Sequence, residues 1–305
     1  MTHRPAIAAL SLLPFSCFAQ PVLPVAPSAA ATQFIIPEFD AARTAFSQTG
    51  AMDLENGKGD MDVTRFEIGS LLSRPISPAE GVFILPLFEY ELTSLNFDGT
   101  PAAFPIHDED LHSLSLSTYV ISMREGSPWF FGGWARAELA SDFQHINGDD
   151  FTFDLAAGAG YRVNDDFTIA IGAALINLNG DDTLIPGINF DWVVSDQVRV
   201  GMYGPTFVAS YTPSEQWSFS FRGDPGGGVW NVTGDAGESR SIDLTSYQLG
   251  LYASRHLTGD LWLTAGAGAT VGNEIAYTRP DGGKLLERDA DAALFGLISL
   301  RLKAW

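Results

Sequence analysis

The histidines outside the N-terminal segment are the first candidates for catalysis: His107, His112, His145 and His256. A hydrolase needs a histidine that an acid orients beside a serine or a water molecule. His112 precedes Ser113 and His107 precedes Asp108, but neither spacing is specific for such an arrangement. The sequence also has no phosphate-binding glycine motif and no Cys/His metal spacing. We therefore expect no enzymatic activity.

A repeated tetrapeptide is a second candidate site. Asn-Gly-Asp-Asp occurs at residues 147–150 and again at 179–182. Asn-Gly and Asp favour tight turns, which is one interpretation of the repeat. Their oxygen atoms are also ligands of Ca²⁺ and Mg²⁺, with lipopolysaccharide phosphates as bridging partners. On this second interpretation the cation-binding loops consist of Asn147, Asp149, Asp150, Asn179, Asp181 and Asp182, and no other cofactor is expected.

A third group consists of arginines and carboxylates that occupy the polar phase of alternating segments. Side chains on a strand alternate between its two faces, so one phase shares one face. Mixed charges of this kind line either a water-filled channel or a plugged interior. We favour a passage or a ligand cavity. The predicted lumen charges are Arg65, Glu67, Glu89, Glu91, Arg136, Glu138, Asp154, Arg162, Asp191, Arg199, Arg222, Arg255 and Arg301.

The alternation that places these charges is clearest in residues 151–175. Phe151, Phe153 and Leu155 share one phase, whereas Asp154 and Arg162 lie among Gly and Ala in the other. The turn Asn-Asp-Asp at 164–166 separates two such segments. Strands in soluble proteins usually have about 5–6 residues, whereas a tilted strand that crosses a bilayer needs roughly 9–11. The alternative is a long hairpin of a soluble sandwich.

The same alternation continues from residue 41 to 305, without an apolar run long enough for a spanning helix. We predict an all-β fold, an antiparallel up-and-down transmembrane barrel of about 14 strands, with about 12 as the alternative. Short connections at 77–80, 125–128, 163–166, 195–197, 212–216 and 256–260 alternate with longer ones, as in such barrels. A glycine-rich stretch, 223–228, is expected to lead into an extended loop.

The N-terminus reads as a secretory signal peptide over residues 1–19, because Arg4 precedes an apolar run and Cys17-Phe18-Ala19 fits a cleavage site. A lipoprotein signal on Cys17 is the rival interpretation. Residues 20–40 are rich in Pro and Ala and are expected to form a periplasmic lead-in. The net charge of −20 excludes nucleic acid as a partner, because the chain would repel phosphates.

Taken together, these features resemble Gram-negative outer-membrane β-barrel proteins, and most of all small barrel families of unknown function. The resemblance rests on Gly160-Tyr161-Arg162 before the 164–166 turn and on a terminal strand ending at Trp305, which departs from the usual phase. It implies an outer-membrane location, contact with lipid and lipopolysaccharide, and insertion by the barrel-assembly machinery. The expected function is a passive channel or small-solute transporter, with a structural or adhesive barrel as the alternative. Acidic loops, including Asp108, Glu109 and Asp110, predict cation preference.

Overall fold

The computed structural model describes residues 40–55, 59–100, 105–178, 181–234, 237–279 and 283–304. The regular elements of the described residues are β-strands and one 3-10 turn, Gly148–Asp150. No helix in these ranges is long and apolar enough to cross a membrane. The expected signal peptide and most of the lead-in lie outside the described residues. Asp40, which we had assigned to the lead-in, is the first residue of the first strand.

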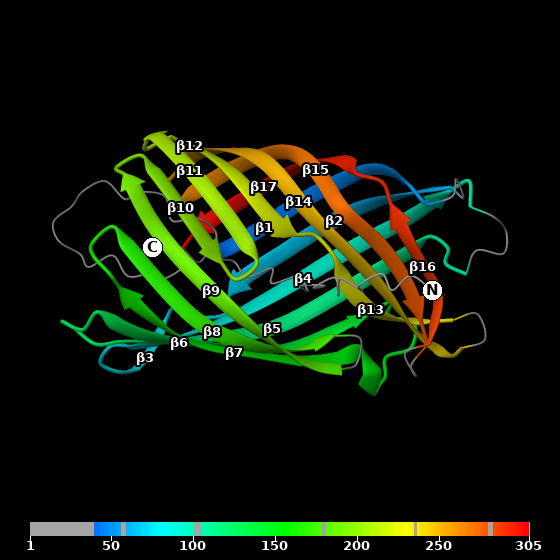
Figure 1. The fold of residues 1–305 in the computed structure, drawn as a ribbon, viewed down its shortest axis with the longest axis horizontal. Helices are drawn as coiled ribbons and strands as arrows, with labels where there is room; N and C mark the ends of the chain where they lie inside the picture. Colours follow the sequence, from blue (N-terminus) through cyan, green and yellow to red (C-terminus); the bar gives the residue numbers. More distant parts are fainter. Residues whose placement is uncertain are drawn as a thin grey trace, which may run out of the picture.

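Long tilted strands make up the whole wall of the molecule (Figure 1). Their bounds are β1 Asp40–Asp53, β2 Asp60–Leu71, β3 Ile76–Ala79, β4 Val82–Asp98, β5 Glu109–Met123, β6 Trp129–Ser141, β7 Phe151–Arg162, β8 Phe167–Leu178, β9 Asp181–Ser195, β10 Val198–Tyr203, β11 Thr206–Ser214, β12 Trp217–Pro225, β13 Gly228–Thr233, β14 Ser239–Thr258, β15 Leu261–Thr278, β16 Lys284–Ala290 and β17 Ala293–Lys303.

Neighbouring wall strands pair antiparallel, and β1 pairs with β17 to close the barrel. β12 and β13 both pair with β14, end to end, and β16 and β17 pair with β15 in the same way. Counting each of these two pairs as one strand and leaving out the short β3 gives a wall of fourteen strands among the described residues. The predicted closed antiparallel barrel is confirmed. A closed barrel leaves no unpaired strand edge around its closed circumference.

The two faces of the wall differ as the alternation predicts. On β7, Phe153 is 69% exposed on the outside, whereas Asp154 is 2% exposed on the inside. Aromatic side chains lie on the outside near one end of the barrel, which we call the short-turn end because the tight connections lie there. Trp129 and Tyr161 meet there with ring centroids 4.8 Å apart. Such a girdle is typical of a membrane interface.

At the opposite end, which we call the loop end, the wall has fewer strands. The β10–β11 hairpin is short, and β9 pairs with β10 only over residues 190–195. Beyond that level β13 contacts β6 instead, through the pair Asn231 and Ser141. The end of β1 pairs with β16 through Leu54 and Ala290. A second ring of nine strands results, formed by β1, β2, β4, β5, β6, β13, β14, β15 and β16.

The smaller ring is filled by a hydrophobic core. Met61, Leu95, Leu111 and Ile275 have no exposed surface, and Trp230 is 1% exposed. A ring of this size has an interior that side chains can fill. The glycine-rich stretch that we expected to open a loop instead joins β12 to β13, and β13 carries Trp230 into the core. The core also contains Met52, Leu54, Val63, Ile106, Ala140, Val232, Ile242, Leu244, Tyr277, Leu286 and Ala293.

Candidate functional site

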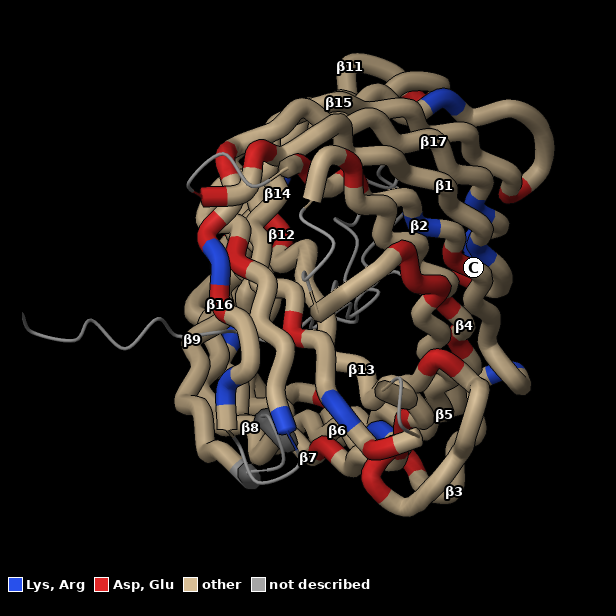
Figure 2. The backbone as a smooth tube through the Cα atoms, turned by 90° about the vertical axis from the view of Figure 1, so that its right-hand side faces the viewer, with Lys and Arg blue, Asp and Glu red and all other residues tan. Residues whose placement is uncertain are grey.

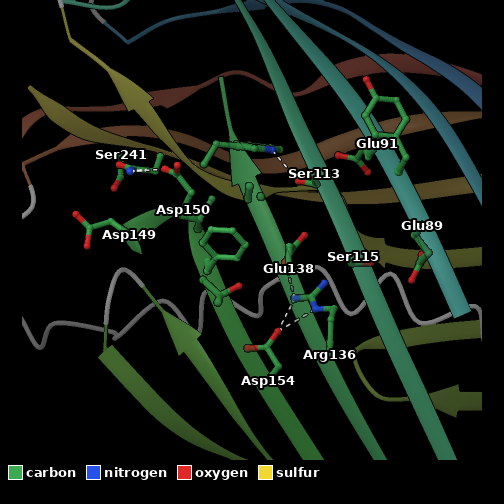
Figure 3. Close-up of a pocket in the computed structure, with 18 of the residues that line it drawn as sticks. Glu89, Glu91, Ser113, Ser115, Arg136, Glu138, Asp149, Asp150, Asp154 and Ser241 are labelled. Atoms are coloured by element: carbon green, nitrogen blue, oxygen red, sulfur yellow. Dashed lines mark hydrogen bonds and ion pairs between the residues drawn. The ribbon is translucent and has the colours of Figure 1, made fainter. Parts of the chain in front are cut away.

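A polar cavity of about 440 Å³ lies inside the barrel, next to the hydrophobic core (Figure 3). Strands β1, β2, β4, β5, β6 and β7 supply its charged wall. The turn before β7 and residues 227–231 form its margin towards the loop end. The carboxylates of the lining are Glu67, Glu89, Glu91, Glu138, Asp149, Asp150 and Asp154, and its arginines are Arg43, Arg136 and Arg279. The lining therefore carries more negative than positive charge.

Arg136 is the centre of the best-defined charge cluster. Its Nη2 lies 2.6 Å from Asp154 Oδ2 on the neighbouring strand β7, and its Nε donates to the same oxygen at 3.0 Å. Glu138 Oε2 is 3.1 Å from the same Nη2 (Figure 3). Arg136 and Asp154 are direct cross-strand partners, so register alone brings them together. Two of the predicted lumen charges, Arg136 and Asp154, therefore form an ion pair.

A second group of ion pairs joins β1, β2 and β4. Arg43 pairs with Glu67. Arg65 is more loosely placed, with Nε 3.8 Å from Glu91 Oε1 and 3.4 Å from the hydroxyl of Thr93. That hydroxyl in turn donates to Glu91 Oε1 at 2.8 Å. Together with the Arg136 cluster, these contacts form a belt of charged side chains on the inner face of β1, β2, β4, β6 and β7.

Four other predicted arginines lie on the inner face away from the cavity. Arg199 pairs with Asp191, whose carboxylate also accepts a hydrogen bond from Tyr203 at 2.8 Å. Arg222 lies over the ring of Tyr252, 4.7 Å from its centroid. Arg301 binds Asp40. Arg162 has the inward phase of β7 at the short-turn end and is half-buried.

Arg255 is the one predicted lumen charge that the structure contradicts. It shares its phase on β14 with Leu249 and Leu251, which face outward, and it is exposed. Its guanidinium lies over the ring of Trp217, 5.4 Å from the centroid. Because this pair is at the short-turn end, the guanidinium of the arginine can reach water while its stem covers apolar surface. The sequence interpretation misassigned its phase.

Sequence reasoning also missed charged residues of the inner face, among them Arg43 and Asp40. Arg43 and Asp40 lie on β1, whose outward positions include Thr44 and Gln48, so its apolar phase is weak. The sequence alone did not give the register between β1 and β2. That register places Arg43 opposite Gly69 and beside Glu67. Charge complementarity between consecutive strands could have placed Arg43.

The side chains of the first Asn-Gly-Asp-Asp turn stabilise the turn itself and connect it to β13. Asn147 Oδ1 accepts from the backbone of Asp149, and Asp150 Oδ2 accepts from the backbone of Asn147 at 2.7 Å. Asp150 Oδ1 accepts from Asn231 Nδ2 on β13 at 2.6 Å, and Asp150 is 1% exposed. Both Asp150 oxygens are therefore engaged by the protein, while Asp149 remains exposed.

No group of three or more His, Cys, Asp or Glu side chains that could hold a metal ion occurs among the described residues. Asn179 lies outside these residues, and only the backbone of Asp181 and Asp182 is described. Cation binding by these loops stays a prediction.

Two of the histidines have definite contacts, neither with a serine nor a carboxylate. His112 Nδ1 is 2.9 Å from the hydroxyl of Tyr90 on the outer face, and its ring stacks on Phe143 at 4.6 Å. His256 Nε2 is 2.5 Å from the carbonyl oxygen of Gly259, and its ring stacks on Trp262. These contacts are those of packed aromatic side chains.

Comparison with known proteins places the chain in a family. Residues 36–290 match the model of a family described as a domain of unknown function, DUF6268. The chain belongs to this family. No curated protein matches the sequence.

Among solved structures, this member of the DUF6268 family is similar to the COG4313 outer-membrane channel from Pseudomonas putida F1. The two share 10% identity and a TM-score of 0.48, covering 91% of this chain and 99% of that one. A FadL homologue from Pseudomonas aeruginosa shares 9% identity and a TM-score of 0.45 over 85% and 89% of the two chains. The toluene transporter TodX from Pseudomonas putida shares 9% identity and a TM-score of 0.32 over 86% and 89%. The family match confirms the predicted resemblance to a family of unknown function, and the strand pairing confirms the barrel fold.

Proposed function

We propose that the chain is an outer-membrane channel that lets small polar solutes pass passively and prefers cations. The short-turn end would face the periplasm, and the loop end would contact lipopolysaccharide. Insertion would depend on the barrel-assembly machinery. The apolar outer face and the aromatic girdle support a bilayer location.

The observation that carries the proposal is the charge of the cavity lining. Seven carboxylates against three arginines give a negative potential inside a low-dielectric wall, which concentrates cations and repels anions. The acidic residues spread around the loop end add to this field (Figure 2). Hydrophobic solutes gain nothing from such a lining.

The position of the cavity supports a path that bypasses the hydrophobic core. Residues 149–152 border the cavity on one side and residues 227–231 border it on the other. Along β6, the pairing with β7 ends at Leu139, and the contact with β13 follows at Ser141, nearer the loop end. A solute that follows this border would leave the barrel beside the core. The mouth would then be off the barrel axis.

The test is the reversal potential of the purified, folded protein in planar bilayers under a salt gradient. Cation preference is expected at low salt and should fade at high salt, where the Debye length falls to about 3 Å. The quadruple variant Asp149→Asn/Asp150→Asn/Asp181→Asn/Asp182→Asn tests the loops, and Glu67→Gln/Glu91→Gln tests the belt. A wild-type channel that favours chloride would refute the proposal.

The packed core favours a second candidate, a structural or adhesive barrel whose acidic loops bind cations or a partner. Sixteen buried residues fill the nine-strand ring and block its centre. Folded protein that shifts in a detergent gel on boiling, yet never conducts, would support this candidate over the channel.

A further inference from the structure

Glu89 occupies an unusual position in the belt, because neither of its described cross-strand neighbours forms an ion pair or a hydrogen bond with its carboxylate. It lies opposite Gly69 on β2 and opposite Ser115 on β5. No hydrogen bond or ion pair to its carboxylate occurs among the described residues, and Figure 3 shows it directed into the cavity without a partner. The carboxylate of Glu89 therefore lies on the wall of the cavity beside an unfilled space, which we call the hollow at Glu89.

The nearby arginines form no ion pair with Glu89 among the described residues. Arg43, Arg136, Glu67 and Glu138 line the same cavity, two residues of each charge. Arg43 is paired with Glu67, and Arg136 is paired with both Glu138 and Asp154. Each cation is thus engaged by another carboxylate, and Glu89 has no ion-pair partner among the described residues.

We propose that Glu89 is the binding point for the ammonium or guanidinium group of a small organic cation that enters the cavity. This inference rests on the proposed channel function and names its substrate class. A nitrogen cation fits because a single carboxylate can accept its charge-assisted hydrogen bond, and the hydroxyl of Ser115 is available beside it.

A divalent metal ion fits the same hollow poorly. Ca²⁺ takes about 6–8 oxygen ligands and Mg²⁺ demands near-octahedral geometry, so both need several converging oxygens. The described residues contain no group of three or more candidate ligands. The cavity of about 440 Å³ is also far larger than a bare ion needs and has room for an organic body.

The experiment measures block of the sodium current by putrescine in planar bilayers, and putrescine binding by calorimetry on the same detergent-solubilised protein. Glu89→Gln keeps the shape of the side chain and removes its charge. We expect it to weaken block and binding by about tenfold or more, the loss of one charge-assisted hydrogen bond. Glu80→Gln, an identical change in the exposed turn between β3 and β4, should leave both unchanged.

Tetramethylammonium serves as the second probe, because it carries the same type of charge without N–H donors. It should bind about tenfold or more weakly than putrescine to wild type, and Glu89→Gln should change its binding less. Equal binding of the two probes, or unchanged putrescine binding in Glu89→Gln, would overturn the proposal while cation selectivity remained intact. A protein that never conducts refutes the channel, and calorimetry then still decides whether Glu89 binds the amine.

Discussion

Asp40 and Arg301 form a bidentate ion pair across the seam that closes the barrel. Arg301 Nε and Nη2 lie 2.9 Å from the two carboxylate oxygens of Asp40, 261 residues away in sequence. Their side chains are 1% and 5% exposed. The first residue of β1 is thereby attached to the last strand.

Removing one partner of this pair should be more harmful than removing both. Asp40→Asn leaves the guanidinium of Arg301 buried without a counter-charge, so we expect a loss of about 3 kcal/mol in the free energy of unfolding. Asp40→Asn/Arg301→Met should recover part of that loss. The measurement is the urea midpoint in detergent, followed by the gel shift of the folded band. Asp165→Asn, an identical change in an exposed turn, is the control. If the urea midpoint of Asp165→Asn equalled that of Asp40→Asn, the prediction would be contradicted.

Trp230 should be a main support of the hydrophobic core. It is 1% exposed, and its Nε1 donates to the hydroxyl of Ser113 at 3.0 Å. Trp230→Ala should cost about 3–5 kcal/mol, because it leaves a large void. Trp230→Phe keeps most of the packing and loses the hydrogen bond, so it should cost less. Because the void adjoins the cavity, Trp230→Ala should also raise single-channel conductance relative to Trp230→Phe, and equal conductance would argue against a path beside the core.

The bond between Asn231 and Asp150 should hold β13 to the turn before β7. Asn231→Leu is close in shape and leaves one oxygen of a buried carboxylate without its donor, at a cost of about 2 kcal/mol. We expect limited proteolysis to cut the segment 142–150 faster in this variant. Asp149→Asn changes an exposed residue of the same turn and is the control. Equal cleavage rates in the two variants would show that contacts other than the Asn231–Asp150 bond hold the turn before β7 to β13.

Four glycines lie side by side on the inner face of β6 to β9: Gly132, Gly158, Gly172 and Gly187. A Cβ at Gly158 would lie 2.7 Å from the carbonyl oxygen of Ile171, whereas one at Gly187 would meet nothing within 4 Å. Gly158→Ala should therefore lower the yield of the folded, heat-modifiable form, and Gly187→Ala should not. Similar yields would mean that the neighbouring strands move apart at little cost.

The long alternating segments could be predicted because membrane strands expose one apolar face. Phe153 and Asp154 on β7 show why: an apolar outer face and a polar interior give opposite constraints at adjacent positions. The strand number followed from counting such segments. The register could not be obtained this way, because alternation is unchanged by a shift of two residues. The Arg43–Glu67 pair and the hollow at Glu89 depend on register, and sequence reasoning therefore missed the first and could not single out the second.

The inner ring of nine strands was also beyond the sequence. Gly226 and Gly227 signal a loop, yet they only interrupt a strand that continues along β14. From the sequence alone, Trp230 would be assigned to a loop. Its place in the core follows only from the contact between β13 and β6. Asp150 reads as a free turn carboxylate for the same reason, since its partner Asn231 is 81 residues away.

The nine-strand ring has a consequence for the order of folding. Its members come from residues 40–141 and from residues 228–290, whereas β7 to β11 contribute nothing to it. Val63, Leu95 and Leu111 therefore remain without their partners until Ile242 and Ile275 arrive from the far part of the chain. Contacts between residues so distant in sequence form late, because a long loop must first be closed. The first strands must therefore be kept from aggregating until the last third of the chain has been made and can join them.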